Sequence, residues 1–178
     1  METKRLFVAV ELPEELRKNI HEFAKQIEQD GIKLVEEHNL HVTMRFIGDV
    51  PEDKVEEITS KLSEIKFSEF ECSVKGTGVF PKPDYIRVVW VALQCEQLTE
   101  LANSVISKLK GIGKPENRPF SAHLTIARVK RKVDLDKFLA ENKEKELGSF
   151  KVNEFSLIES RLTPEGPVYT KVKSFPSG

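Results

Sequence analysis

The chain has 178 residues and a formal net charge of −1 at pH 7, from 28 Lys and Arg against 29 Asp and Glu. This length is ample for one hydrophobic core and marginal for two independent ones. The near-neutral charge excludes a protein that clamps nucleic acid with a broadly basic surface, so any such contact must be local. A strand is predicted within a few residues of the N-terminus, and no apolar run is long enough to span a bilayer. We therefore expect no signal peptide, no membrane contact and a cytoplasmic location.

The first half of the chain alternates between predicted strands and helices. Residues 6–10, Leu-Phe-Val-Ala-Val, are an apolar run of strand length. A helix is expected next, because Pro13 fits its first turn, Glu14 and Glu15 suit its positive end, and apolar residues recur at helical spacing. Gly31 lies just beyond that helix, where a left-handed C-cap is expected.

The next predicted elements are a strand from residue 41, a helix over residues 51–65, and strands over residues 71–80 and 85–93. The segment between the last two strands, residues 81–84, reads Pro-Lys-Pro-Asp, which is typical of a turn. These two strands are therefore predicted to form a hairpin.

The second half of the chain repeats the first, in the register that aligns residue 123 with residue 41. Residues 88–92 correspond to the first apolar run, an amphipathic helix follows, and Gly113 takes the place of the first glycine. The correspondence continues more loosely, with a shorter helix over residues 134–145 and strands over residues 152–162 and 168–174. A Pro-containing turn again separates the last two strands. This registration indicates an internal duplication.

A four-residue motif, His-apolar-Thr-apolar, occurs at the same place in both halves, as residues 41–44 (His-Val-Thr-Met) and 123–126 (His-Leu-Thr-Ile). In a strand, successive side chains alternate faces, so His and Thr share one face, roughly 6–7 Å apart, while the apolar residues point into a core. Two such strands would bring two imidazoles and two hydroxyls together. That set of groups suits acid–base chemistry on an oxyanion such as phosphate.

We predict one α+β domain over residues 1–178, made of two similar lobes with an internal repeat of approximately residues 6–84 and 88–170. Each lobe is expected to contain a mostly antiparallel sheet with helices on its outer face. The other faces of the two sheets are expected to line a central cleft.

Arginines near the two motifs are candidates for contacting a ligand. Arg45 is the next residue on the strand face of His41 and Thr43, so it is predicted to point into the cleft. Arg118 and Arg128 flank the second motif, and Arg128 is out of phase with the second His and Thr unless its strand bulges. The alternative for each arginine is a surface salt bridge.

Phe46 and Phe120 lie beside the motifs and could stack a nucleobase. Aromatic residues next to a strand more often belong to a core, so both interpretations stay open for these two side chains.

The sequence predicts neither a cofactor nor a catalytic metal. It contains no His-x-x-x-His, no Cys-x-x-Cys and no cluster of Asp or Glu near either motif. Cys72 and Cys95 lie in predicted strands at a spacing that matches no zinc or redox motif, and we expect them to be buried free thiols.

Two His-x-Thr-x motifs in a duplicated chain of this size resemble the 2H phosphoesterase superfamily. Within it, residues 41–48 and 118–128 are similar to the bacterial and archaeal RNA 2′,3′-cyclic phosphodiesterases, formerly called 2′-5′ RNA ligases. Residues 159–169 match the end of those sequences as well, so the resemblance covers essentially the whole chain. One departure is Ala122, where relatives often carry Pro; it should alter how the strand begins and not the chemistry.

The resemblance implies a metal-independent hydrolase that opens a terminal 2′,3′-cyclic phosphate on RNA to leave a 2′-phosphate. By the same resemblance His41 is the proton donor and His123 the proton acceptor, although the near-symmetry of the motifs leaves that order open. Thr43 and Thr125 would hydrogen-bond to the non-bridging oxygens. A minor 2′-5′ ligation of tRNA halves is also implied. The expected partner is RNA with such an end, or a nucleotide, and the protein is expected to be a monomer.

Two other functions are compatible with the same residues. The site could act on a small-molecule cyclic phosphate instead of RNA. The chain could also be a module that binds RNA ends or nucleotides, with histidines that contact phosphate and catalyse nothing.

Overall fold

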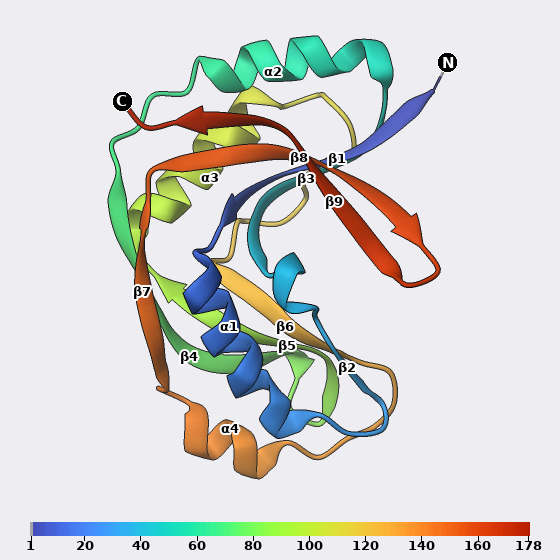
Figure 1. The fold of residues 1–178 in the computed structure, drawn as a ribbon, viewed down its shortest axis with the longest axis vertical. Helices are drawn as coiled ribbons and strands as arrows, with labels where there is room; N and C mark the ends of the chain where they lie inside the picture. Colours follow the sequence, from blue (N-terminus) through green and yellow to red (C-terminus); the bar gives the residue numbers. More distant parts are fainter. Residues whose placement is uncertain (1) are drawn as a thin grey trace.

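The computed structural model describes residues 2–178, which form two sheets and the helices that cover them (Figure 1). In chain order the elements are β1 (Thr3–Glu11), α1 (Glu14–Ala24), η1 (Lys25–Ile27), β2 (Ile32–Leu34), η2 (Glu37–Asn39), β3 (His41–Pro51), η3 (Glu52–Lys54), α2 (Val55–Ser63), β4 (Phe70–Lys82), β5 (Tyr85–Gln94), α3 (Glu96–Lys108), β6 (His123–Val129), α4 (Asp136–Asn142), β7 (Glu146–Val152), β8 (Glu154–Thr163) and β9 (Gly166–Pro176). Among these residues no helix is both long and apolar enough to cross a membrane.

Strand β1 and helix α1 form where the sequence predicts them. The apolar run of β1, residues 6–10, is buried along its whole length. Pro13 stands at the start of α1, where its carbonyl accepts the first helical hydrogen bond from the amide of Arg17 at 3.0 Å. The apolar face of α1, which includes Leu16 and Ile20, is buried.

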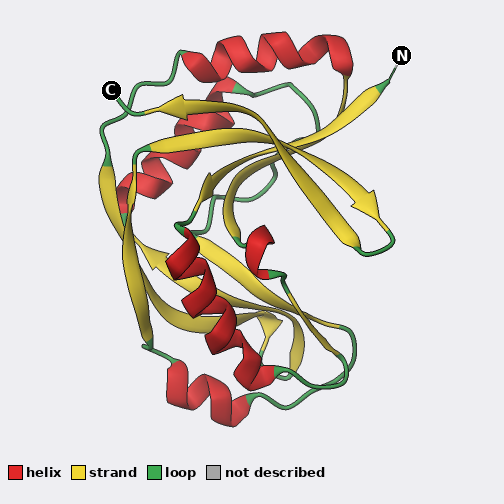
Figure 2. Ribbon diagram, in the orientation of Figure 1, coloured by secondary structure: helices red, strands yellow, loops and turns green. Residues whose placement is uncertain are grey.

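The two sheets are antiparallel throughout, as the α+β prediction requires. One sheet has the strand order β3-β1-β8-β9 and the other β2-β6-β5-β4-β7. We call them sheet A and sheet B. Figure 2 shows that they form two lobes, with sheet A in the upper half of the view and sheet B in the lower half.

Each sheet takes strands from both halves of the sequence. In the register of the repeat, β1, β3 and β4 correspond to β5, β6 and β8. Yet β1 pairs with β8 of the second half, and β5 pairs with β4 of the first half. The lobes of the structure are therefore not the two sequence repeats, residues 6–84 and 88–170, but an exchange between them.

One short turn explains the place of β4 in this exchange. The β4–β5 hairpin turns over Pro83 and Asp84, just as the β8–β9 hairpin turns over Pro164 and Glu165. A two-residue turn forces the strands on either side of it to pair. Because the boundary between the repeats falls at Pro83 and Asp84, the last strand of the first repeat has to join the sheet of the second.

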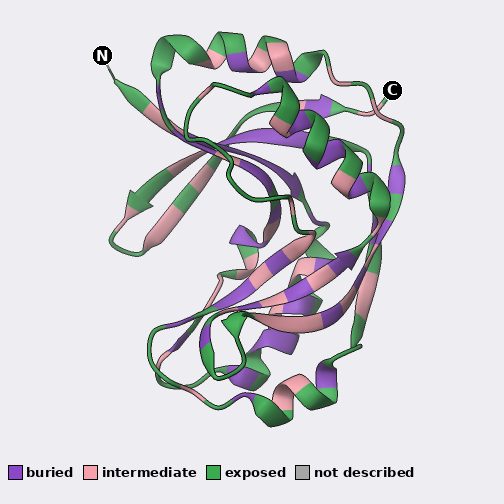
Figure 3. Cartoon of the chain, turned by 180° about the vertical axis from the view of Figure 1, so that it is seen from behind, coloured by how far each residue is buried: buried purple, intermediate pink, exposed green. Residues whose placement is uncertain are grey.

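The helices are exchanged in the same way. Helix α1 follows a strand of sheet A but packs against β6 and β7 of sheet B, whereas α3 follows a strand of sheet B and packs against β3 of sheet A. Helix α2 contacts α3 and β9, and α4 contacts β4. Figure 3 shows, from behind, that buried residues concentrate on the strands and on the helix faces turned towards them.

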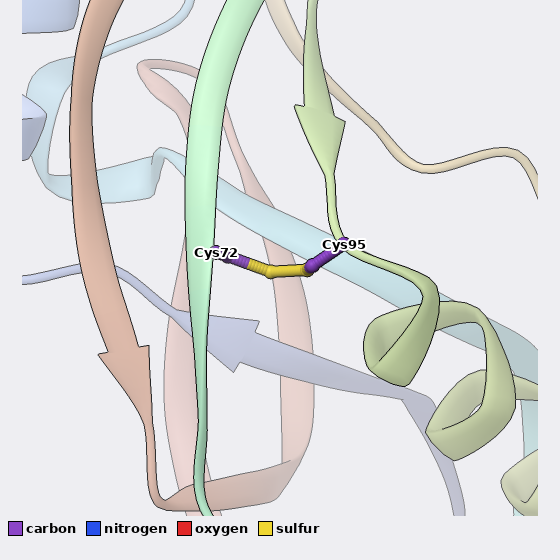
Figure 4. Close-up of a disulfide and its surroundings, with 2 residues drawn as sticks. All are labelled: Cys72 and Cys95. Carbon is purple, nitrogen blue, oxygen red and sulfur yellow. A yellow bond between two sulfur atoms is a disulfide. The ribbon is translucent and has the colours of Figure 1, made fainter.

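Cys72 and Cys95 form a disulfide, so the prediction of two free thiols is wrong (Figure 4). The bond joins β4 to the residue that follows β5, with the two Cα atoms 5.3 Å apart. The hairpin register explains the pairing, because Ser73 is the partner of Gln94, and one further step in the same register places Cys72 opposite Cys95.

Candidate active site

The two His-x-Thr motifs open the strands β3 and β6, which contact each other across the two sheets. The four motif side chains line one small cavity of about 110 Å³. The residues that line it are Val35, Asn39, His41, Thr43, His123, Thr125 and Arg128. Two imidazoles, two hydroxyls and one guanidinium therefore converge on a space between the lobes.

The ring of His41 is held at both nitrogens. Nδ1 lies 2.6 Å from the carbonyl oxygen of Asn39, and Nε2 lies 2.9 Å from Oγ1 of Thr43. A carbonyl can only accept, so Nδ1 carries a hydrogen and donates it. Nε2 then accepts from the Thr43 hydroxyl when the ring is neutral and becomes a donor when the ring is protonated. This arrangement leaves Nε2 as the nitrogen that is available for proton exchange.

His123 is oriented differently. Its Nδ1 is buried and has no hydrogen-bond partner of good geometry among the described residues. The other nitrogen, Nε2, is therefore the one available for proton exchange.

Burial lowers the pKa of both histidines below the ordinary value, because it penalises the charged imidazolium. For His41, the Asn39 carbonyl and then the carboxylate of Glu11 raise the pKa, and Arg128 adds to the lowering. For His123, the only opposing influence is the backbone carbonyl of Ser121. Both rings are thus biased towards the neutral form, and His41 has more groups that favour its protonation.

A pair of aromatic rings flanks each histidine. Phe7 and Tyr169 have ring centroids 4.8 Å and 5.1 Å from that of His41. Phe80 and Trp90 lie 5.1 Å and 6.0 Å from His123. Phe7 and Trp90 come from the strands next to β3 and β6, which are β1 and β5, whereas Tyr169 comes from β9 and Phe80 from β4.

Both motif strands carry a β-bulge directly after the motif threonine. In β3, Thr43 and Arg45 pair with the adjacent residues Ala9 and Val8, so Met44 has no partner of its own. In β6, Ile126 is skipped in the same way opposite β5. The two bulged positions are equivalent in the repeat, and a one-residue bulge reverses the face to which the following side chains point.

The first bulge makes the prediction for Arg45 wrong. Arg45 is only 3% exposed and does not continue the face of His41 and Thr43. Its guanidinium donates to the carbonyl of Ile112 at 2.9 Å through Nη2 and to the carbonyl of Phe46 through Nη1. Arg45 therefore fastens the segment after α3 to strand β3.

The second bulge places Arg128 in the cavity. Strict alternation puts this residue out of phase with His123 and Thr125, but the skipped Ile126 restores it to their face. The corresponding residue of the first repeat is Phe46. Phe46 and Arg128 therefore occupy equivalent positions in the two repeats.

The other predicted contacts do not line the cavity. Phe46 packs with a small apolar cluster that includes Phe7, and the guanidinium of Arg5 lies 5.1 Å from its ring centroid. Phe120 packs against the main core, and Arg118 is exposed on the segment before β6. Tyr169 and Asn39, which line cavities beside His41, were not singled out from the sequence. The only signals for them are the short distance of Asn39 from the motif and the place of Tyr169 in the C-terminal segment.

Two further cavities adjoin the first, which we call the motif cavity. One, of about 110 Å³, shares Asn39 and His41 with the motif cavity. The other, of about 450 Å³, lies between the β2–η2 segment and the tip of the β8–β9 hairpin and shares Asn39 and Arg128 with the motif cavity. It is large enough for a small organic ligand. Asn39 also donates from Nδ2 to the carbonyl of Pro167 in that hairpin, at 3.4 Å. Within residues 2–178, no three His, Cys, Asp or Glu side chains are grouped so as to hold a metal ion.

A family model described as LigT-like phosphoesterase matches residues 10–90 and again residues 92–169. The chain belongs to this family. The double match of LigT-like phosphoesterase agrees with the internal duplication, because each copy contains one His-x-Thr motif.

Individual LigT-like phosphoesterases resemble the chain over nearly its full length. The RNA 2′,3′-cyclic phosphodiesterase of Archaeoglobus fulgidus is 41% identical over 174 residues, which cover 96% of this chain and 99% of the relative. That of Methanocaldococcus jannaschii is 36% identical with the same coverage. The crystal structure of Escherichia coli LigT complexed with 3′-AMP superposes with a TM-score of 0.84, at 28% identity and with 99% of both chains covered.

Proposed function

We propose that this LigT-like phosphoesterase hydrolyses the terminal 2′,3′-cyclic phosphate of RNA to a 2′-phosphate by two-histidine acid–base catalysis. The observation that carries the proposal is the single cavity that joins His41, Thr43, His123 and Thr125. The substrate class is supported by the names of the two archaeal relatives. The 3′-AMP in the complex of Escherichia coli LigT supports a nucleotide in this fold.

The proposed reaction is a nearly in-line displacement at phosphorus. A water oxygen attacks phosphorus as Nε2 of neutral His123 takes the proton of that water. The bond from phosphorus to O3′ breaks, and O3′ receives the proton from Nε2 of protonated His41. The products are a 3′-hydroxyl and a 2′-phosphomonoester. Acid and base must stand on opposite sides of phosphorus, which fits motif strands that belong to different sheets. Both protons pass through imidazoles, so this mechanism uses no metal ion.

The remaining groups of the cavity stabilise charge on the non-bridging oxygens. Thr43 and Thr125 can donate hydroxyl hydrogen bonds, and Arg128 supplies a positive charge. The Thr43 hydroxyl contacts Nε2 of His41 at 2.9 Å, so on substrate binding it would exchange this contact for a phosphate oxygen.

The assignment of His41 as the acid is supported by its surroundings. Burial, with Arg128, lowers the pKa of His41, and the Asn39 carbonyl and the Glu11 carboxylate act against this by favouring the imidazolium form. His123 has only the Ser121 carbonyl as a comparable influence, which suits a group that must begin the reaction neutral.

The reverse reaction at the same site, with a 5′-hydroxyl in place of water, would join RNA ends through a 2′-5′ linkage. We expect this ligation of tRNA halves to be a minor reaction in water. The protein is proposed to act as a monomer. It is proposed to act in the cytoplasm.

The test is turnover of a short RNA with a 2′,3′-cyclic phosphate end in the presence of EDTA, with the product isomer identified. We expect the 2′-phosphate alone, and a loss of about 10²–10⁴-fold in kcat for His41→Ala and for His123→Ala, with the fold intact. His21→Ala is the control, since this histidine lines neither the motif cavity nor the cavity that Glu11 and His41 share, and its ring Nδ1 lies 3.2 Å from the backbone carbonyl oxygen of Val35. Turnover of mononucleotide cyclic phosphates but not of RNA would favour a small-molecule substrate. Binding of the RNA without turnover would favour a binding module.

A further inference from the structure

The two motif histidines have different neighbours on the adjacent strand. Glu11 is the partner of His41 in the β1–β3 ladder, whereas Ala92 is the partner of His123 in the β5–β6 ladder. The residue that corresponds to Glu11 in the second repeat is Leu93. Directly paired residues of an antiparallel ladder share a face, with their Cβ atoms about 5 Å apart. A carboxylate is therefore paired with His41 on the adjacent strand, and no carboxylate takes the equivalent position beside His123.

The carboxylate of Glu11 is held in position. Its Oε1 accepts a hydrogen bond from Oγ of Ser156 at 3.2 Å and lies 3.0 Å from Nζ of Lys171. Ser156 is only 1% exposed, so the first of these contacts comes from the interior of sheet A. Glu11 and His41 also line a common cavity of about 110 Å³, which shares Asn39 and His41 with the motif cavity but does not include Thr43.

The other charged and titratable groups that face His41 come from four elements. They are Arg17 of α1, His38 of η2, His123 and Arg128 of β6, and Tyr169 and Lys171 of β9. The cations among them oppose a positive charge on the imidazole. Of the described residues that line the two cavities beside His41, Glu11 is the only carboxylate.

We propose that Glu11 is a positioning residue that commits His41, and not His123, to the role of proton donor. The inference rests on the proposed function, which needs one protonated and one neutral histidine. Glu11 stabilises the imidazolium of His41 from the adjacent strand β1, and Ser156 and Lys171 hold its carboxylate. The raising influence of Glu11 on the pKa of His41 has the required sign. The symmetry of the two motifs is thus broken by a residue outside both of them.

The test compares Glu11→Gln, which removes the charge, with Glu11→Asp, which keeps it. Glu159→Gln is the matched control, because Glu159 also pairs with a lysine on sheet A, at 3.5 Å from Lys4, and lies outside the cavities of His41. Two readouts are needed. NMR titration of the ring Cε1–H signals gives the pKa of each histidine, with His41→Gln and His123→Gln used for assignment. The pH profile of kcat/KM on the cyclic-phosphate RNA shows which limb moves.

For Glu11→Gln we expect the pKa of His41 to fall by about half a unit or more at low ionic strength, since a unit negative charge is removed from the residue paired with His41. The limb of the rate profile that belongs to His41 should move to lower pH by the same amount, and the limb of His123 should stay. Glu11→Asp should retain most of the wild-type profile, and Glu159→Gln all of it.

An unchanged His41 pKa in Glu11→Gln, with normal wild-type turnover, would overturn the role of Glu11 and leave the proposed function standing. Movement of the His123 limb instead would also overturn it. Absence of turnover by the wild-type enzyme would overturn the proposed function, and the donor role with it. The NMR titration would then still show whether Glu11 controls the protonation of His41.

Discussion

The carbonyl oxygen of Asn39 accepts a hydrogen bond of 2.6 Å from Nδ1 of His41, and the side chain of the same residue donates to the carbonyl of Pro167 at the tip of the β8–β9 hairpin. Asn39 is buried, at 7% exposure. One residue therefore fixes the tautomer of the His41 imidazole and connects it to a hairpin that borders the 450 Å³ cavity.

Replacing Asn39 with Ala should disturb the site more than the fold. The variant loses one side-chain hydrogen bond, so we expect the free energy of unfolding to drop by about 1 kcal/mol. The carbonyl that orients His41 is no longer tied to the hairpin. We therefore expect kcat to fall even though the variant stays folded under the assay conditions. Urea unfolding and steady-state kinetics measure the two effects, with the exposed Asn19→Ala as control. Equal wild-type kcat values for both variants would contradict the linkage.

Arg45 and Arg128 should respond in opposite ways to the same substitution. Arg45→Met leaves the Ile112 and Phe46 carbonyls without their charged donor, so we expect a loss of about 2–3 kcal/mol in the free energy of unfolding. Arg128→Met removes a positive charge from the motif cavity, so kcat/KM should fall by about 10²-fold or more with the melting temperature nearly unchanged. Thermal unfolding and kinetics of both variants check this. A stable Arg45→Met enzyme that has lost activity would indicate that Arg45 does contact substrate.

The stability of the protein should decrease on mild acidification because of the two motif histidines. Burial lowers their pKa values in the folded state below about 6.5, the value expected in the unfolded chain. The folded state therefore binds fewer protons than the unfolded chain, and the free energy of unfolding falls as the pH drops through about 6.5 towards the folded-state pKa values. Urea midpoints measured from pH 8 to pH 5 should show a smaller loss for the double variant His41→Gln/His123→Gln. Parallel curves for the two proteins would contradict the burial argument.

The Cys72–Cys95 disulfide should stabilise the fold. The two cysteines are 23 residues apart, and closing a loop of this length is worth about 3 kcal/mol through the unfolded chain. The double variant Cys72→Ser/Cys95→Ser should show a correspondingly lower urea midpoint than the oxidised protein. Mass spectrometry after alkylation of the denatured, unreduced protein is the direct check, since incorporation of two alkyl groups would show free thiols.

The parts of the fold that the sequence predicted are those that local chemistry determines. The buried run of β1, the start of α1 at Pro13 and the two hairpin turns depend on residues close in the chain, and all are found where the pattern indicates. The exchange of strands between repeats was not predicted, because similarity between two segments does not say with which copy each strand pairs. The turn at Pro83 and Asp84 contained that information, and with the hairpin register it also aligned Cys72 with Cys95.

The motif residues reached the same cavity because strict alternation holds from each His to its Thr. It fails one residue later, at the bulges of Met44 and Ile126. Nothing in the residue types at these positions distinguishes a bulge from regular strand, so the sequence pattern misplaced Arg45 and left Arg128 undecided. The internal repeat makes such bulges partly predictable, because a bulge known in one copy predicts a bulge at the equivalent position of the other.

The central claim, that His41 protonates the departing O3′ and His123 activates water, is tested most directly with a substrate whose leaving group needs no proton. In a 2′,3′-cyclic phosphorothiolate with sulfur in place of O3′, the leaving group can depart as an unprotonated thiolate near neutral pH, because the pKa of a thiol is about 8.5. The measurement is turnover of this substrate by His41→Ala and His123→Ala. The proposed mechanism predicts that sulfur restores most of the activity of His41→Ala and none of that of His123→Ala. Restoration of His123→Ala instead, or of neither variant, would contradict it.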